Sequence, residues 1–280
     1  MAAGEVGTFR AADGYEFYLR RWHPPALPRA RLVVLHGVRS HGGWYERSCT
    51  AFAAGGLAVT LLERRGAGLN TARRGDAPGF RRLLDDVAEF LRADRRTRAD
   101  LPTVVMGVSW GGKLAAGLPY RHPGLADALV LVCPGLCPRV RPPLAARLRI
   151  LAARLLRPTR EFDIPLNDAE LFTGDPRWQA YLRANRHDLR RATARFLVAS
   201  TALDVYLRRA RQHVRTSVLT LLAGRDRVID NARTRRYVSR FPSRDNRVLD
   251  YPGTEHTLEF EPDADCPFVA DVLRWVGRRV

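Results

Sequence analysis

The chain has 280 residues, 46% of them hydrophobic, which suits one α/β domain with a full core, with or without an inserted subdomain. It lacks a run of about 18 apolar residues, and its start lacks the basic-then-apolar order of a signal peptide, so we expect a cytoplasmic protein. The net charge of +18, from 46 arginines and one lysine against 29 acidic residues, predicts attraction to polyanions. No helix-turn-helix, zinc-finger or RNA-binding motif indicates nucleic acid as a specific partner.

Short apolar runs alternate with helical patterns along most of the chain, which predicts an α/β fold with a mostly parallel sheet. Residues 7–22 are expected to form a hairpin with its turn at Asp13-Gly14. Apolar residues at helical spacing predict core helices at 81–92 and 268–276. Further strands are expected at 31–35, 57–62, 103–106, 128–133, 218–223 and 247–251.

The alternation stops between about Pro138 and Arg215, where nearly 80 residues show helical periodicity and no strand pattern. This segment holds 17 arginines against 7 acidic residues, so about +10 of the net charge lies there. We therefore predict a basic helical insertion at 138–215 within a core formed by 1–137 and 216–280.

The segment T-V-V-M-G-V-S-W-G-G-K-L-A-A-G (103–117) places Ser109 among Gly107, Gly111 and Gly112. Glycine weakens both strands and helices, so its concentration here indicates a turn in which a strand and a helix approach closely. The G-x-S-x-G pattern between an apolar run and a helix-compatible run predicts a nucleophile elbow with Ser109 as nucleophile. The alternative is a glycine-rich connection around a buried serine.

A serine nucleophile needs a base, and the base needs an acid that orients it. His256 follows the last expected strand and Asp226 follows the strand before it, and such loops carry the functional groups of parallel sheets. We predict His256 as the base and Asp226 as the acid, with Asp230 and Asp250 as weaker competitors. The histidines expected at the surface are His23, His122, His187 and His213.

Ester cleavage also needs two backbone N–H donors for the developing oxyanion. We predict these donors at Trp110, directly after the serine, and at Val38, where His36-Gly37 lets the chain pass close to the elbow. The alternative is a glycine-rich loop without this role. Neither a metal nor an organic cofactor is expected. The four cysteines are expected to be packing residues: Cys49, Cys133, Cys137 and Cys266.

Together these motifs resemble the α/β-hydrolase superfamily and, within it, the monoacylglycerol lipases and lysophospholipases related to serine aminopeptidases. The likeness is carried by L-H-G-V-R-S-H-G-G-W-Y, L-E-R-R-G-A-G-L-N, G-V-S-W-G-G, A-G-R-D-R-V-I-D and G-T-E-H-T-L-E-F. It implies an α/β-hydrolase fold with a Ser109–Asp226–His256 triad and an oxyanion hole at Val38 and Trp110.

The chain departs from that group at a few positions. Lipases of the group carry histidine and methionine around the serine, where this chain has Val108 and Trp110. The tryptophan is closer to proline iminopeptidases, but their H-G-G-P-G loop is absent. Glu63 replaces the usual aspartate of the D-x-R-G-x-G loop. These departures concern the substrate rather than the triad.

The resemblance also implies that the insertion, after the sixth strand, is a helical cap over an acyl pocket. Its expected helix at 143–157 has a leucine arc and a basic side. Either this helix lies on an anionic bilayer, or its leucines face the hydrolase core and its arginines are solvated. The leucines are Leu144, Leu148, Leu151 and Leu155, and the arginines are Arg147, Arg149, Arg154 and Arg157.

We predict a serine hydrolase that cleaves carboxylic esters through an acyl-enzyme, with monoacylglycerols or lysophospholipids as substrates. In the first interpretation of the helix, the protein also contacts the inner membrane surface transiently. One alternative is an aminopeptidase or amidase of the proline iminopeptidase type, in which Glu170, Asp175 or Asp188 would hold a substrate amine. Others are acyl transfer to an alcohol other than water, and a non-catalytic lipid-binding protein.

Overall fold

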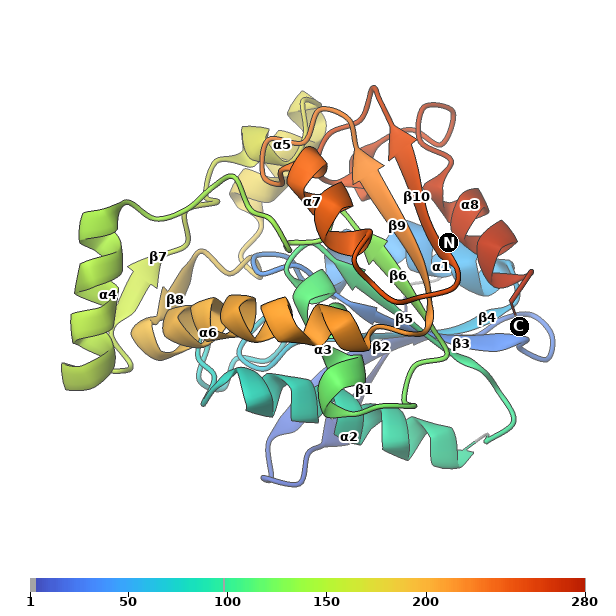
Figure 1. Ribbon diagram of the computed structural model, residues 1–280, viewed down its shortest axis with the longest axis horizontal. Coiled ribbons are helices and arrows are strands. Elements are labelled where there is room, and N and C mark those ends of the chain that lie inside the picture. Colours follow the sequence, from blue (N-terminus) through green and yellow to red (C-terminus); the bar gives the residue numbers. More distant parts are fainter. Residues whose placement is uncertain (1–3, 98, 280) are drawn as a thin grey trace.

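The computed structural model describes residues 4–97 and 99–279, and an eight-stranded sheet forms the centre of this part of the chain (Figure 1). The strand order is β1-β2-β4-β3-β5-β6-β9-β10. β1 pairs with β2 as the predicted antiparallel hairpin, β2 is antiparallel to β4, and the remaining neighbours are parallel. The strands are β1 Glu5–Arg10, β2 Glu16–Trp22, β3 Ala30–Leu35, β4 Leu57–Leu62, β5 Thr103–Val108, β6 Ala128–Val132, β9 Ser217–Ala223 and β10 Asn246–Tyr251.

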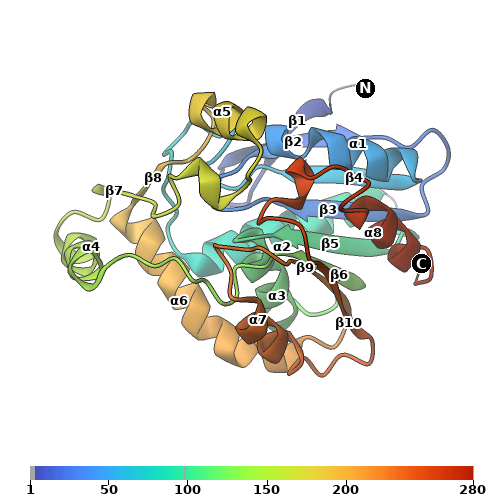
Figure 2. The ribbon, with the colours of Figure 1, turned by 90° about the horizontal axis from the view of Figure 1, so that it is seen from above.

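Helices cover both faces of this sheet, as the view from above shows (Figure 2). The central strands are apolar throughout because their side chains point alternately to two cores. In β3, Val33 and Leu35 pack in the core beneath α2 and α3, while Leu32 and Val34 pack in the core beneath α1 and α8. The helices outside the β6–β9 connection are α1 Glu46–Ala54, α2 Phe80–Thr97, α3 Gly111–Arg121, α7 Asn231–Val238 and α8 Phe268–Val276, with short 3-10 turns η1 Gly42–Trp44 and η4 Leu258–Phe260.

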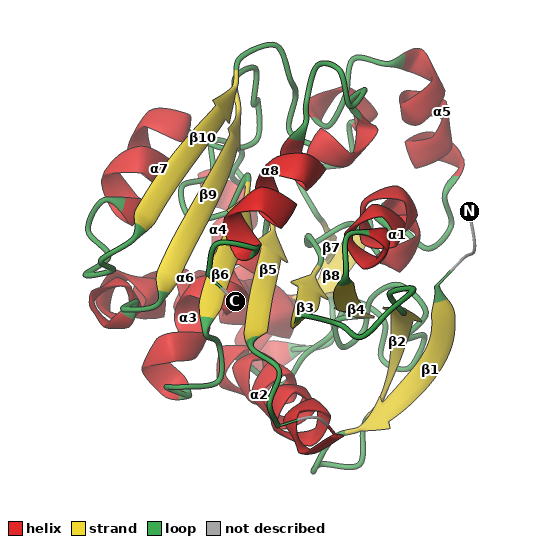
Figure 3. Ribbon diagram, turned by 90° about the vertical axis from the view of Figure 1, so that its right-hand side faces the viewer, coloured by secondary structure: helices red, strands yellow, loops and turns green. Residues whose placement is uncertain are grey.

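The strands predicted from the sequence are confirmed, and the carboxyl ends of the parallel strands β5, β9 and β10 lie at the same edge of the sheet (Figure 3). The run at 57–62 coincides with β4, whereas β5 continues to Val108, beyond the predicted end at Met106. Gly107 conceals this continuation because glycine is unfavourable in strands. Among the described residues, no helix is both long and apolar enough to cross a bilayer.

The connection between β6 and β9, here called the insertion, is mainly helical but also contains a short antiparallel strand pair that the sequence did not indicate. Three residues per strand are too few to show a periodic pattern. α6 buries Leu203 and Leu207 in the same core as α2 and α3, so the division at 138–215 stays a prediction. The elements are α4 Leu144–Leu156, β7 Glu161–Asp163, η2 Ala169–Leu171, α5 Pro176–Ala184, β8 Arg191–Thr193, α6 Ala194–Ala210 and η3 Arg211–His213.

Helix α4 lies at one extreme of the molecule, away from the sheet (Figure 1). It packs against the start of α6 through Ile150 and Ala153. At about 100° per residue these two side chains lie on the side opposite the leucine arc. The interpretation in which the leucines face the hydrolase core is therefore wrong. The exposed side chains are Leu144, Leu148, Leu151, Leu155 and Leu156, with exposed fractions between 53% and 84%.

Candidate active site

Ser109 occupies the turn between β5 and α3 in a left-handed conformation, with a φ of 50° that residues other than glycine rarely adopt. The glycines around it serve close approach. A Cβ on Gly111 would lie 2.1 Å from the Leu35 carbonyl oxygen, and one on Gly107 would lie 2.6 Å from the Gly112 Cα. The strained backbone is thus at the serine itself, in a turn whose neighbours leave no room for side chains.

Ser109, His256 and Asp226 form a continuous hydrogen-bonded chain. The Ser109 Oγ lies 3.0 Å from His256 Nε2, and His256 Nδ1 lies 2.8 Å from Asp226 Oδ2. The other carboxylate oxygen of Asp226 accepts the N–H groups of Val228 and Ile229, each at 2.8 Å. With Nδ1–H donated to the carboxylate, Nε2 is free to accept the serine proton. The structure thus brings together the three residues that the sequence singled out.

The two competing aspartates have other partners. Asp230 is the N-cap of α7, where its side chain accepts the Arg233 N–H at 2.9 Å, as its position at a helix start suggested. Asp250, on β10, forms an ion pair with Arg235 of α7. Neither carboxylate contacts His256, so Asp226 holds the only position suited to orienting the imidazole among these three.

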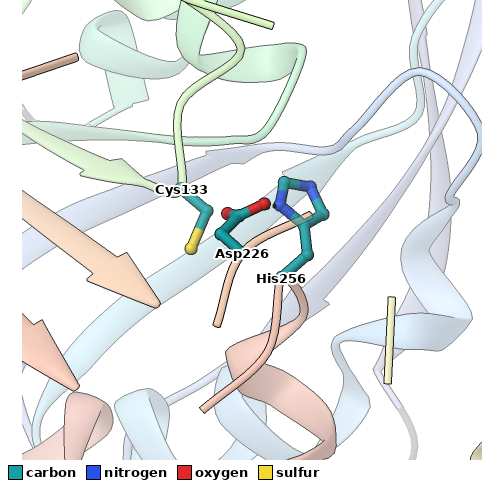
Figure 4. A group of neighbouring side chains, drawn as sticks. All are labelled: Cys133, Asp226 and His256. Carbon is teal, nitrogen blue, oxygen red and sulfur yellow. Dashed lines mark hydrogen bonds and ion pairs between the residues drawn. The ribbon is translucent and has the colours of Figure 1, made fainter. Parts of the chain in front are cut away.

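Cys133, the residue after β6, lies on the side of the Asp226 carboxylate away from the His256 ring (Figure 4). Its sulfur, an Asp226 oxygen and a His256 nitrogen lie within 4.8 Å of one another. Burial raises the pKa of the Cys133 thiol well above its usual range, which keeps it protonated. Because both His256 nitrogens are held by Ser109 and Asp226, a metal could bind this group only by breaking that chain. The contacts suit a neutral packing thiol.

The loop after β3 passes directly over the serine. A Cβ on Gly37 would lie 3.5 Å from the Ser109 Cβ. His36 Nδ1 donates to the Gly37 carbonyl at 2.8 Å, and its Nε2 accepts the Arg64 N–H at 2.9 Å. Burial lowers the pKa of His36 to about 3, so the ring is neutral and these two bonds define its tautomer. His36 therefore fixes the orientation of the Gly37–Val38 peptide.

That peptide carries the predicted donor of Val38. In a trans peptide the N–H points away from the C=O, so anchoring the Gly37 carbonyl also aims the Val38 N–H. Among the hydrogen bonds of the described residues, none uses the N–H of Val38 or Trp110 as donor. Both predicted oxyanion donors are therefore available to an outside acceptor.

Arg64 connects these two residues and was not predicted to have a role. Its guanidinium donates to the Val38 carbonyl at 2.8 Å and lies over the ring of Trp110, 5.2 Å from its centroid. A second ring, that of Phe196 in α6, lies 4.7 Å away. Burial lowers the pKa of Arg64 to about 10, which leaves it cationic near neutral pH. The L-E-R-R-G motif contains Arg64 but does not reveal this contact.

A pocket opens beside Ser109 and His256, with about 490 Å³ of empty space including its open mouth. The insertion supplies Leu166 and Phe172 to its wall, and the Phe172 ring meets the His256 ring edge-on at 5.8 Å. The polar part of the wall comprises Arg39, Ser40, Tyr45, Thr257 and Glu259, and the apolar part further includes Val38, Trp44, Met106, Val108, Val132, Leu258 and Phe268.

The acidic residues that the peptidase alternative requires are used elsewhere. Asp188 is buried in an ion pair with Arg39, and Asp175 is the N-cap of α5. Glu170 lies at the surface, 3.7 Å from Arg183. Among the residues described, these three do not line the pocket beside Ser109.

The mostly parallel eight-stranded sheet, with a serine, a histidine and an aspartate in contact at its carboxyl edge, defines an α/β-hydrolase, as predicted. The chain matches the family described as serine aminopeptidase, S33, over residues 26–263, and it belongs to that family.

Three comparisons describe its relatives. The chain is 27% identical over 277 residues to a monoacylglycerol lipase from Mycolicibacterium smegmatis, covering 96% of this chain and 95% of that one. It is 23% identical over 287 residues to a monoglyceride lipase from Mus musculus, covering 96% and 89%. The fold is similar to the crystal structure of a soluble variant of monoglyceride lipase from Saccharomyces cerevisiae in complex with a substrate analog, with a TM-score of 0.87, 17% identity and coverage of 100% and 97%.

Proposed function

We propose that this protein is a serine hydrolase that cleaves the carboxylic ester of monoacylglycerols or lysophospholipids. The observation that carries the proposal is the Ser109–His256–Asp226 contact at the wall of a largely apolar pocket. The lipase names of the full-length relatives support the same substrate class.

The reaction follows from the contacts at Ser109. His256 Nε2 takes the hydroxyl proton as the Ser109 Oγ attacks the ester carbonyl, and Asp226 stabilises the resulting imidazolium. The oxyanion binds the N–H groups of Val38 and Trp110. His256 then protonates the leaving alcohol, which leaves an acyl-enzyme. Water repeats the sequence, with His256 again as base, and releases the carboxylic acid.

The pocket favours an acyl chain over a charged peptide terminus. Its aliphatic and aromatic wall gains free energy by burying a hydrocarbon chain. A substrate amine would need an ionised carboxylate near Ser109. Glu259 lines the pocket, but its Oε1 accepts the Ser48 N–H at 3.0 Å and burial raises the pKa of its carboxyl to about 7, which favours the neutral form. Asp188, the most buried of the three acids considered, already holds Arg39. An ester with an uncharged acyl part is therefore the better fit.

We further propose that α4 contacts an anionic membrane surface when the enzyme takes up its substrate. Its exposed leucines at 144, 148, 151 and 155 form an apolar ridge, and the exposed Arg147 and the half-buried Arg154 lie beside it. Such a helix lies in the interface plane with its leucines among acyl chains and its arginines at anionic headgroups. Flotation of the protein with phosphatidylglycerol-containing vesicles tests this contact.

Turnover on a substrate panel tests the chemistry. The panel contains a monoacylglycerol, lysophospholipids of differing headgroup charge and a proline arylamide, each with the wild type, Ser109→Ala and the surface control Ser239→Ala. We expect ester cleavage that falls by at least about a thousandfold in Ser109→Ala and is unchanged in the control. Cleavage of the arylamide alone would move the assignment to a peptidase. Without turnover on any substrate, a lipid-binding role would replace the proposal.

A further inference from the structure

Arg39, the residue after Val38, is a buried cation in the loop over Ser109. Its Nε donates to Asp188 Oδ2 at 3.1 Å. The second oxygen of Asp188 accepts the indole N–H of Trp44 at 2.8 Å. Both Arg39 and Asp188 are almost completely buried. A buried ion pair persists only where further hydrogen bonds satisfy both ions, and here they do.

The remaining partners of the Arg39 guanidinium all belong to the insertion. Nη1 donates to the carbonyls of Leu166 at 2.9 Å and Asn167 at 3.2 Å, after β7. Nη2 donates to the Leu182 carbonyl at 3.1 Å, in α5. One side chain of the loop over Ser109 thus joins three parts of the insertion, at 166–167, 182 and 188.

The backbone of Arg39 is tied to the insertion as well. Its carbonyl accepts the Leu189 N–H at 2.8 Å. The two preceding carbonyls are held by the core instead: Gly37 by His36 and Val38 by Arg64. The peptide that carries the Val38 N–H is therefore fixed on one side by core residues, and the chain directly after it is fixed by the insertion.

We propose that Arg39 is a positioning residue, whose ion pair with Asp188 makes the oxyanion hole depend on the insertion being seated over the pocket. The inference rests on the proposed function, because it takes the Val38 N–H as an oxyanion donor. When the insertion is seated, Arg39 and its carbonyl hold the loop and the Val38 N–H faces Ser109. When the insertion lifts, the chain after Val38 loses its anchor, and His36 and Arg64 alone hold the donor peptide, which then faces Ser109 less exactly. Full catalytic power thus develops only over an enclosed substrate.

The structure offers a matched control on the same insertion. Arg195, at the start of α6, donates through Nε to Asp76 Oδ1 at 3.0 Å and so ties the insertion to the loop between β4 and α2. This ion pair has no contact with the loop over Ser109 among the described residues. Arg195→Met should therefore remove one tie of the insertion, while Arg39 and Asp188 still hold the insertion against the oxyanion loop.

The experiment compares Arg39→Met, Asp188→Asn and Arg195→Met on a short water-soluble ester, with a trifluoromethyl ketone as transition-state analogue. The ketone forms a tetrahedral adduct with the serine, whose oxyanion needs the donors. Because removing one oxyanion donor costs about 10²–10³ in rate, we expect a displaced donor to lower kcat at least about tenfold. The inhibition constant of the ketone should rise by the same factor, with little change in KM, in Arg39→Met and Asp188→Asn only.

The outcomes separate this inference from the proposed function. If Arg195→Met lowers kcat as much as Arg39→Met, or if the ketone binds Arg39→Met as tightly as wild type, the positioning role is wrong. If Arg39→Met does not fold, Arg39→Lys takes its place in the experiment. Lysine keeps the charge but cannot reach the four acceptors of Arg39, so an unchanged kcat in this variant would also overturn the positioning role. Activity that survives Ser109→Ala would instead refute the proposed function itself.

Discussion

The exposed leucine ridge of α4 makes a quantitative prediction for membrane binding. Leu148 and Leu155 expose 58% and 84% of their surface. Full burial of a leucine is worth about 1.5–3 kcal/mol, so the exposed parts of both together contribute roughly 2–4 kcal/mol in contact with acyl chains. Alanine retains part of that area, and the double variant Leu148→Ala/Leu155→Ala should lose about 2 kcal/mol. That loss corresponds to about 30-fold weaker partitioning into vesicles.

Flotation with vesicles containing phosphatidylglycerol measures this partitioning directly. Leu27→Ala is the matched control, because Leu27 exposes 85% of its surface but lies before β3, at the sheet edge opposite Ser109. Hydrolysis of a short soluble ester should be unchanged in all variants, since α4 lies outside the pocket. Equal flotation of the wild type and the double variant would refute the reasoning, and so would an equal loss in Leu27→Ala. Raising the salt concentration should weaken only the contribution of the arginines to vesicle binding, and not that of the leucines.

Two further predictions concern stability. Burial raises the pKa of Glu63 to about 7, so its carboxyl keeps a proton that the unfolded chain releases near pH 4.5. The contribution of this protonated carboxyl to the free energy of unfolding is full below pH 4.5 and is lost as the pH rises to about 7. Between pH 5 and 8 the free energy of unfolding should fall by roughly 2–3 kcal/mol more in the wild type than in Glu63→Gln. Urea unfolding measures this difference, and an equal shift of the unfolding midpoint with pH in both proteins would contradict the prediction. Gly111→Ala should cost about 2 kcal/mol or more, because its Cβ would lie 2.1 Å from a carbonyl oxygen. Gly79→Ala, where no atom lies within 4 Å, should be nearly neutral in the same assay.

The positions of the strands along the chain and the residues that follow them could be predicted from the sequence because both depend on local patterns. Strands buried on both faces read as continuous apolar runs, and parallel strands deliver the residues after them to one edge. Ser109, Asp226 and His256 each follow such a run, and their side chains meet. The long sequence separation did not hinder the prediction, because the sheet itself provides the proximity.

The arginine contacts could not be predicted in the same way. A chain with 46 arginines gives no signal for which few are buried. Arg39 and Arg64 are recognised only by acceptors that lie elsewhere in the sequence, such as the carbonyls of Leu166 and Val38. Their burial depends on the tertiary arrangement of the insertion against the core. Composition therefore predicted a basic surface and missed the cations inside the molecule, Arg39 and Arg64 among them.

Helix α4 shows why periodicity alone does not tell which side of a helix is buried. The sequence has two apolar sides on this helix, the leucine arc and a smaller side with Ile150 and Ala153. Packing against Ala194 selects the smaller side, since short side chains let two helices approach closely, and the leucines remain outside. The insertion consequently carries an apolar ridge on its outer helix and the partners of Arg39 on its inner side. If both proposals hold, one segment takes up the lipid at the membrane surface and, once seated over it, completes the oxyanion hole.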